Sequence, residues 1–293
     1  MPLVAIPNVS TGNASTLRGF EDIIRSAGAV VLDTHSDAVH DRSVLTVGGG
    51  VTALQRAMVA LANAARRIDL SAQKGVHPRI GALDVCPFVP HEHTGIEMAI
   101  DVARKTGELI AEHAGVPVYL YGEAATRSTT RLLSDLRRGG LTGLRARAEQ
   151  GLPPDFGPTV VKESTGVVCV GAREVLIAFN VWLRCPLEGA RSIASRVREA
   201  GGGLPGVRAL GFPTGSPDVA HVSMNLTAPA ITGITKAFDA VDAEARRLGV
   251  EVLATEIVGL PPERFQPPPL ARATRLLREP GRSLEAALVE ARL

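Results

Sequence analysis

Short apolar runs alternate along the chain with longer stretches in which apolar residues recur every three or four positions. The short runs predict buried strands, and the longer period predicts helices with one buried face. In the helix expected over residues 51–68, for example, Leu54, Met58, Leu61 and Ala65 fall on one side. The first part of the chain is thereby predicted to hold a strand, a helix, two strands, a helix and a strand, at residues 4–7, 13–26, 29–33, 43–47, 51–68 and 83–88.

The same order of elements returns later in the chain. A helix at 96–113 and a strand at 116–121 extend the first part, and a segment rich in Pro and Gly at 151–158 then interrupts the pattern. A second series of strand, helix, two strands, helix and strand is predicted at residues 175–183, 187–200, 206–212, 220–226, 232–248 and 251–257. This βαββαβ order is that of the ferredoxin-like fold. We therefore expect an α+β protein of two packed subdomains, residues 1–175 and 176–293, each a mixed β-sheet with helices on one face.

Composition narrows the class of protein. The 293 residues include 45% hydrophobic but only 3% aromatic side chains, and 32 Lys and Arg balance 30 Asp and Glu. Scarce aromatics and the lack of a basic block disfavour binding to single-stranded nucleic acid. No apolar run approaches the roughly 20 residues of a membrane helix, and the N-terminus has no signal-peptide pattern. The scattered Cys86, Cys169 and Cys185 are typical of a reducing compartment. We expect a cytoplasmic protein without nucleic-acid or membrane partners.

The candidate chemistry is densest in residues 74–82, called here the histidine loop, which join a helix to a strand. His77 precedes Pro78, which restricts the backbone of the histidine toward extended conformations. Nearby glycines let a ligand approach the main chain closely, and Lys74 and Arg79 supply positive charge for carboxylates. Histidine is the usual general acid and base at neutral pH. The alternative is a turn histidine that donates to a neighbouring carbonyl.

Other polar groups point to no further chemistry. The histidines at 35, 40, 91 and 93 lack a converging set of Cys or carboxylate ligands, so no metal is expected. The arginine-rich stretch at residues 127–147 is interpreted as a solvated helical face.

Several segments resemble the glutamate formiminotransferase family. The most specific is GVHPRIGALDVCPFVP at residues 75–90. The others are PNVS at 7–10, VPVYLYGEAA at 116–125, PDFGP at 154–158, GAR at 171–173, LIAFN at 176–180, VSMNL at 222–226 and IVGL at 257–260. The likeness covers residues 4–262, and it is to a version of the family without the cyclodeaminase domain attached in animals.

The resemblance implies transfer of a formimidoyl group from N-formimino-L-glutamate to tetrahydrofolate, in the degradation of histidine. It implies that His77 is the catalytic acid–base, tetrahydrofolate the co-substrate, and the assembly a homodimer. Because both substrates carry carboxylates, Asn8, Arg42, Lys74 and Arg79 are the candidates for binding the glutamate substrate. The family's folate-binding stretch, called here the folate segment, corresponds to Gly157, Pro158, Thr159, Val160, Val161, Lys162, Glu163, Ser164, Thr165 and Gly166.

The folate segment departs from the family pattern at Val160, Val161, Lys162, Glu163 and Thr165, and His35 is a departure elsewhere. Thr165 stands where the animal enzymes carry tryptophan, and His35 where they carry aspartate. Two alternatives therefore stay open: formyl transfer from N-formylglutamate at the same site, and a folate-binding protein without turnover.

Overall fold

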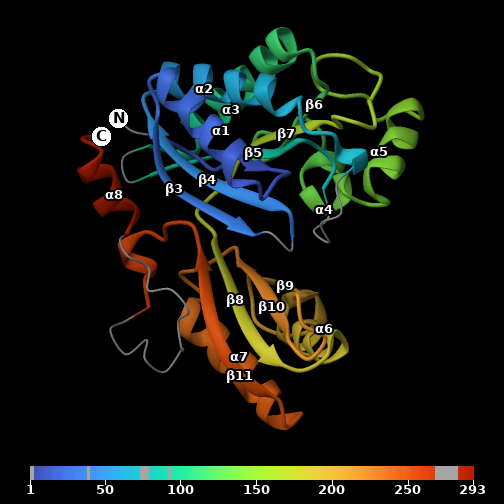
Figure 1. Ribbon diagram of the computed structural model, residues 1–293, viewed down its shortest axis with the longest axis vertical. Helices are drawn as coiled ribbons and strands as arrows, with labels where there is room; N and C mark the ends of the chain where they lie inside the picture. The colour runs from blue at the N-terminus through green and yellow to red at the C-terminus, as the bar shows by residue number, and fades with distance from the viewer. Residues whose placement is uncertain (1–2, 38–39, 73–78, 92–93, 268–282) are drawn as a thin grey trace. The chain divides into compact units, whose positions relative to one another are not determined.

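Among the residues that the structure describes, the strands form two β-sheets, each in its own unit (Figure 1). The computed structural model describes residues 3–37, 40–72, 79–91, 94–267 and 283–293. Contacts divide the chain into a first unit, Met1–Glu174 with Ala291–Leu293, and a second unit, Val175–Glu290. Helices and sheets occur in both units, which confirms the α+β class.

The first unit follows the predicted βαββαβ order and then extends it. Its strands and α-helices are β1 (Leu3–Ala5), β2 (Asn8–Val9), α1 (Ala14–Ser26), β3 (Val30–Asp37), β4 (Arg42–Gly49), α2 (Val51–Ala65), β5 (Leu83–Val89), α3 (Ile96–Ala114), β6 (Val118–Gly122), α4 (Leu133–Leu136), α5 (Gly140–Glu149) and β7 (Val168–Ala172). The strand predicted at residues 4–7 is split into β1 and β2. Pro7 has no N–H to continue the ladder, and pairing resumes at Asn8.

The seven-stranded sheet of this unit is mixed. β1 and β2 both lie between β4 and β5, β3 pairs with the other edge of β4, and β7 lies between β5 and β6. The pairs among β1 to β5 are antiparallel, whereas β5–β7 and β6–β7 are parallel. β7 was not predicted, although its sequence Val-Cys-Val-Gly-Ala follows the run of apolar residues expected of a fully buried strand.

Different elements pack on the two faces of this sheet. Helices α1, α2 and α3 lie on one face and enclose the larger core (Figure 1). Side chains alternate along β6, so that Val118 and Leu120 join this core while Tyr119 and Tyr121 point the other way. Tyr119 and Tyr121 belong to a smaller cluster with Leu136 of α4 and other apolar side chains. The sheet thus gains a partial second layer beyond the expected helices on one face.

The second unit has the predicted βαββαβ order. Its elements are β8 (Ile177–Arg184), α6 (Leu187–Val197), β9 (Val207–Pro213), β10 (Ala220–Leu226), α7 (Ile234–Arg247), β11 (Glu251–Val258) and α8 (Leu284–Glu290). The strand order is β11-β8-β10-β9, and all three pairings are antiparallel rather than mixed. The reason is topological: each crossover helix returns the chain to a strand two places away, and the intervening strand runs the opposite way.

Within the described ranges, no helix is both long and apolar enough to span a bilayer.

Candidate functional site

The folate segment lies against the end of the histidine loop, although the two are far apart in sequence. Ala82 N donates to Thr165 O at 3.0 Å, and Val167 N donates to Ile80 O at 2.9 Å. Gly81 and Gly166 form an antiparallel bridge between the two segments. Lys74 and His77 themselves lie outside the described residues, so the structure defines only the C-terminal end of the loop.

The folate segment is largely exposed, and Val161 carries its one buried side chain. Val161 is 4% exposed and belongs to the smaller core cluster of the first unit. A tight turn follows, in which Gly166 N donates to Lys162 O at 2.8 Å, and Leu70 N donates to Ser164 O at 2.8 Å. Lys162, Glu163 and Ser164 are exposed, whereas Thr165 is half-buried. The segment thus presents the polar side chains of residues 162–164 and the apolar Val160 to solvent, on a backbone held by Leu70 and by the end of the histidine loop.

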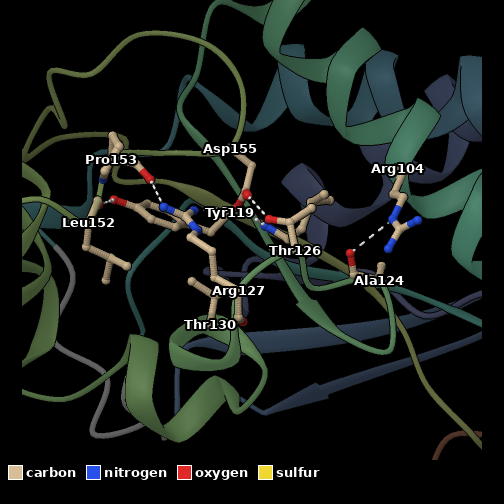
Figure 2. A network of polar contacts seen from close by, with 10 residues as sticks. Arg104, Tyr119, Ala124, Thr126, Arg127, Thr130, Leu152, Pro153 and Asp155 are labelled. Carbon is tan, nitrogen blue, oxygen red and sulfur yellow. Dashed lines mark hydrogen bonds and ion pairs between the residues drawn. The ribbon is translucent and has the colours of Figure 1, made fainter.

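A network around Asp155 fixes the chain just before this segment (Figure 2). The Asp155 carboxylate accepts hydrogen bonds from Leu120 N at 2.8 Å, from Thr126 Oγ1 at 2.6 Å and from Arg127 Nη2 at 2.8 Å. Arg127 also donates to Pro153 O at 2.7 Å. The entry to the folate segment is therefore tied to β6 by charge-assisted hydrogen bonds, which are stronger than neutral ones.

The interpretation of residues 127–147 as a solvated helical face is wrong for three arginines. Arg127 binds Asp155, and Arg147 donates to the carbonyls of Asp135 and Leu136. Arg137 is only 18% exposed at its side chain and pairs with the buried carboxylate of Asp84. The stretch contains two short helices, α4 and α5, and Arg137 is the residue that ends α4.

Several predicted substrate-binding residues lie around Asp84. Arg42, at the start of β4, donates to the side-chain oxygen of Asn8. Loss of solvent around the Arg42 guanidinium, followed by repulsion from Arg137, lowers the pKa of Arg42 to about 10, while Asp84 opposes this shift. Asn8 and Arg42 are therefore brought together, and two residues not predicted for the site, Asp84 and Arg137, lie close to Arg42.

Arg79 is held by backbone carbonyls. Its guanidinium donates to Asp41 O at 3.0 Å and to His40 O at 2.7 Å. Burial lowers the pKa of Arg79, whereas Asp41 and Asp84 raise it. Asp41 has a left-handed φ of 46°, and its side chain accepts from Gly12 N at 2.7 Å. Arg79 thus ties the histidine loop to the turn that leads into β4.

His35, which also departs from the family pattern, lies on β3. It is opposite Val44 on β4, and Val44 is opposite Asn8 on β2. Residues directly opposite on neighbouring strands share a face of the sheet. His35 and Asn8 therefore share the face opposite that of Leu45, which joins the core under α1 and α2.

An open hollow of about 630 Å³ lies beside the folate segment. Its lining combines the folate segment with α1, α2 and the turn after α2, through Ile23, Ala60, Asn63, Ala64, Arg66, Arg67, Lys162, Ser164 and Thr165. Three of these side chains are cationic and none is a carboxylate, so the hollow suits an anionic ligand. Elsewhere in the described part of the chain, no three His, Cys, Asp or Glu side chains gather in a way that could hold a metal ion.

Both halves of the chain match models of known protein domains. The model of the formiminotransferase domain, N-terminal subdomain, matches residues 3–173, and that of the formiminotransferase domain matches residues 178–266. The glutamate formimidoyltransferase of Thermoplasma acidophilum is 39% identical over 266 residues, and that of Streptococcus pyogenes serotype M1 is 36% identical over 264. Each alignment covers 88% of this chain and 88% of the relative.

A longer relative matches over part of its length. The formimidoyltransferase-cyclodeaminase of Sus scrofa is 37% identical over 267 residues, which are 88% of this chain and 49% of the relative. Matches to both subdomains, in order and over nearly the whole chain, agree with the motifs around the histidine loop and the folate segment. The chain belongs to the formiminotransferase family of group-transferring enzymes.

Proposed function

We propose that this enzyme transfers the formimidoyl group from N-formimino-L-glutamate to tetrahydrofolate, giving 5-formiminotetrahydrofolate and L-glutamate in histidine degradation. The match to both formiminotransferase subdomains carries this proposal. It is supported by the contact between the folate segment and the histidine loop, through the hydrogen bond from Ala82 N to Thr165 O and the bridge between Gly81 and Gly166. The co-substrate and the catalytic loop would then share one scaffold.

The reaction requires a proton to leave N5 of tetrahydrofolate and a proton to reach the departing glutamate nitrogen. N5 of tetrahydrofolate attacks the amidine carbon, and a tetrahedral intermediate forms. The bond from that carbon to the glutamate nitrogen then breaks, while N5 loses a proton and the departing amine gains one. His77 accepts the first proton and donates the second, a contribution of about 10²–10⁴-fold. Holding both substrates in register supplies much of the remaining acceleration.

The glutamate substrate binds through its carboxylates at the cationic residues near the histidine loop. Asn8, Arg42, Lys74 and Arg79 make up this site. The environment of Arg42 supports it, because burial and then repulsion from Arg137 lower the pKa of Arg42 to about 10. A carboxylate from the substrate beside Arg42 would stabilise the charged guanidinium.

Tetrahydrofolate binds along Gly157–Gly166, with Lys162 as the partner of its glutamate carboxylates. The described residues fit an anionic ligand at this place, since the hollow beside Lys162 is lined by Arg66 and Arg67 and by no carboxylate. Thr165 lines the same hollow, where the animal enzymes would place an aromatic ring. No metal takes part, because proton transfer and positioning suffice for this reaction.

The enzyme acts as a cytoplasmic homodimer in which residues 1–175 and 176–293 are the two formiminotransferase subdomains. This division is supported by the separate sheets and cores of the two units.

A parallel assay of two donors tests the proposed reaction. Purified enzyme is mixed with tetrahydrofolate and either N-formimino-L-glutamate or N-formylglutamate, and the folate product is followed by its absorbance. We expect turnover with the formimino donor and at most a small rate with the formyl donor. A faster reaction with N-formylglutamate would assign the enzyme to formyl transfer instead. Folate binding without turnover of either donor would indicate a folate-binding protein that is not an enzyme.

A further inference from the structure

We propose that Asp84 is a positioning residue of the transfer reaction: its carboxylate holds the end of the histidine loop in place, and Arg137 holds that carboxylate. This inference rests on the proposed role of His77, but its structural half can be tested without turnover. Asp84 comes seven positions after His77, at the start of β5, and belongs to neither the predicted catalytic set nor the predicted binding set.

The two carboxylate oxygens of Asp84 contact different partners. Oδ1 accepts a hydrogen bond from Ile80 N at 2.8 Å, and Oδ2 forms the ion pair with Arg137. Ile80 is the second described residue after the gap that contains His77. Ile80 O accepts from Val167 N, the residue directly after the folate segment, and Gly81 forms a bridge with Gly166 inside that segment. Asp84 thus fixes the point at which the histidine loop meets the folate segment.

The side chain of Asp84 is too deeply buried to exchange these partners for water. It is 2% exposed, and its partner Arg137 is 18% exposed. A buried carboxylate is stable only when it is paired and hydrogen-bonded, so the Ile80 N–H and the Arg137 guanidinium are both needed. Carboxylate hydrogen bonds to backbone N–H groups are strong and directional. The orientation of the loop backbone at Ile80 is therefore determined by a side chain, not by a strand pairing alone.

Small displacements at this point matter for catalysis. A shift of about 1 Å in a reacting group can cost on the order of 10²-fold in rate. His77 lies only three residues before Ile80, with Pro78 and Arg79 between them. Arg79 is itself held by the carbonyls of His40 and Asp41. Asp84 and Arg79 together leave little freedom to the chain on the C-terminal side of the histidine.

Two double variants distinguish the hydrogen bond from Ile80 N to residue 84 from the ion pair between Asp84 and Arg137. Asp84→Asn with Arg137→Met keeps an acceptor oxygen for Ile80 N and removes both charges, whereas Asp84→Ala with Arg137→Met removes the acceptor as well. We expect the first to keep kcat within about threefold of the wild type. We expect the second to lose at least ~10-fold in kcat, with the KM of either substrate changed much less. Equal kcat in the two double variants would overturn the proposal.

Hydrogen exchange supplies a readout that does not depend on activity or on the donor. The Ile80 amide should exchange slowly in the wild-type protein and in the Asp84→Asn, Arg137→Met variant, but quickly in the Asp84→Ala, Arg137→Met variant. Fast exchange at Ile80 in the wild type would overturn the proposal even if no variant folds. If Ile80 is protected by Asp84 but His77→Ala retains full activity, the proposed role of His77 fails and the hydrogen bond alone stands.

Glu21→Gln is a control for general loss of a partly buried carboxylate. Glu21 on α1 accepts from Thr34 Oγ1 at 2.7 Å and pairs with Arg25, in the same unit as Asp84. This variant should lower the thermal midpoint without changing kcat. A fall in kcat for Glu21→Gln comparable with that for Asp84→Ala, Arg137→Met would show that the effect is unspecific, and would overturn the proposal.

Discussion

Gly81 and Gly166 pack with their backbones in direct contact, in a bridge that no side chain could enter. A Cβ atom on Gly81 would lie 1.8 Å from Val167 O, and one on Gly166 would lie 2.0 Å from Ile80 O. Gly166 also has a left-handed φ of 64°. The two glycines therefore set the distance between the folate segment and the histidine loop.

We expect Gly166→Ala to destabilise the protein by more than the left-handed backbone alone explains. That conformation costs an L-residue about 1–2 kcal/mol, and the clash with Ile80 O adds to it. Gly115→Ala is the matched control, since Gly115 has a φ of 62° with no atom within 4 Å of the added Cβ. Denaturant unfolding of both variants should show the larger loss for Gly166→Ala. Equal losses in unfolding free energy would mean that the Gly81–Gly166 bridge accommodates the added methyl group at no further cost.

His77→Ala should lower kcat at least ~10²-fold, because the shuttled proton loses its acceptor and donor. The thermal midpoint should change little. His113→Ala, at the exposed end of α3, serves as the control and should leave kcat unchanged. A His77→Ala enzyme with nearly normal kcat would transfer the catalytic role to another group, and His35 is the next to test.

Arg42→Met should weaken binding of the glutamate substrate. The pKa of Arg42 is lowered to about 10, chiefly by burial and then by Arg137, so a carboxylate bound beside Arg42 would stabilise its charged form. L-glutamate at 100 times its Kd should stabilise the wild type by about 2.7 kcal/mol. Its effect on the thermal midpoint should be much smaller in Arg42→Met, and normal in Arg131→Met, which removes an exposed pair with Glu123. An undiminished glutamate effect in Arg42→Met would exclude Arg42 from the site.

Thr165→Trp should tighten binding of tetrahydrofolate. Thr165 is half-buried and lines the hollow beside the folate segment, so an indole at this position has space to pack on the folate ring. Such aromatic contact is worth about 0.5–1.5 kcal/mol beyond the area it buries, close to tenfold in affinity at the upper end. Titration calorimetry measures the change, and unaltered or weaker binding would place the folate ring away from Thr165.

Lys162→Ala should weaken folate binding through loss of one exposed positive charge. Because exposed charge pairs are screened by salt, the difference between wild type and Lys162→Ala should shrink at high ionic strength. Lys236→Ala, an exposed lysine on α7, should bind folate normally at both salt concentrations. If Lys162→Ala binds folate like the wild type in low salt, this part of the folate segment does not contact the ligand.

The order of elements was accessible from the sequence because hydrophobic periodicity is a local property. The helix predicted at 13–26 was found at Ala14–Ser26, where the Asn13 side chain accepts from Thr16 N, and both βαββαβ series were found. β7 was missed because its five buried residues follow a Pro- and Gly-rich stretch and pair in parallel with distant strands. Local patterning does not show which strand will lie between two others.

The sequence by itself determined the class of the fold, the family, and the two segments with candidate chemistry. Residue types and spacing are enough for these, since motifs and apolar faces are written in neighbouring positions. Only the tertiary structure decided that the folate segment lies against the histidine loop and that Arg137, 53 positions from Asp84, joins that aspartate. A charged side chain in a polar stretch looks solvated until the fold supplies a buried partner, because burial depends on contacts between elements and not on the local sequence.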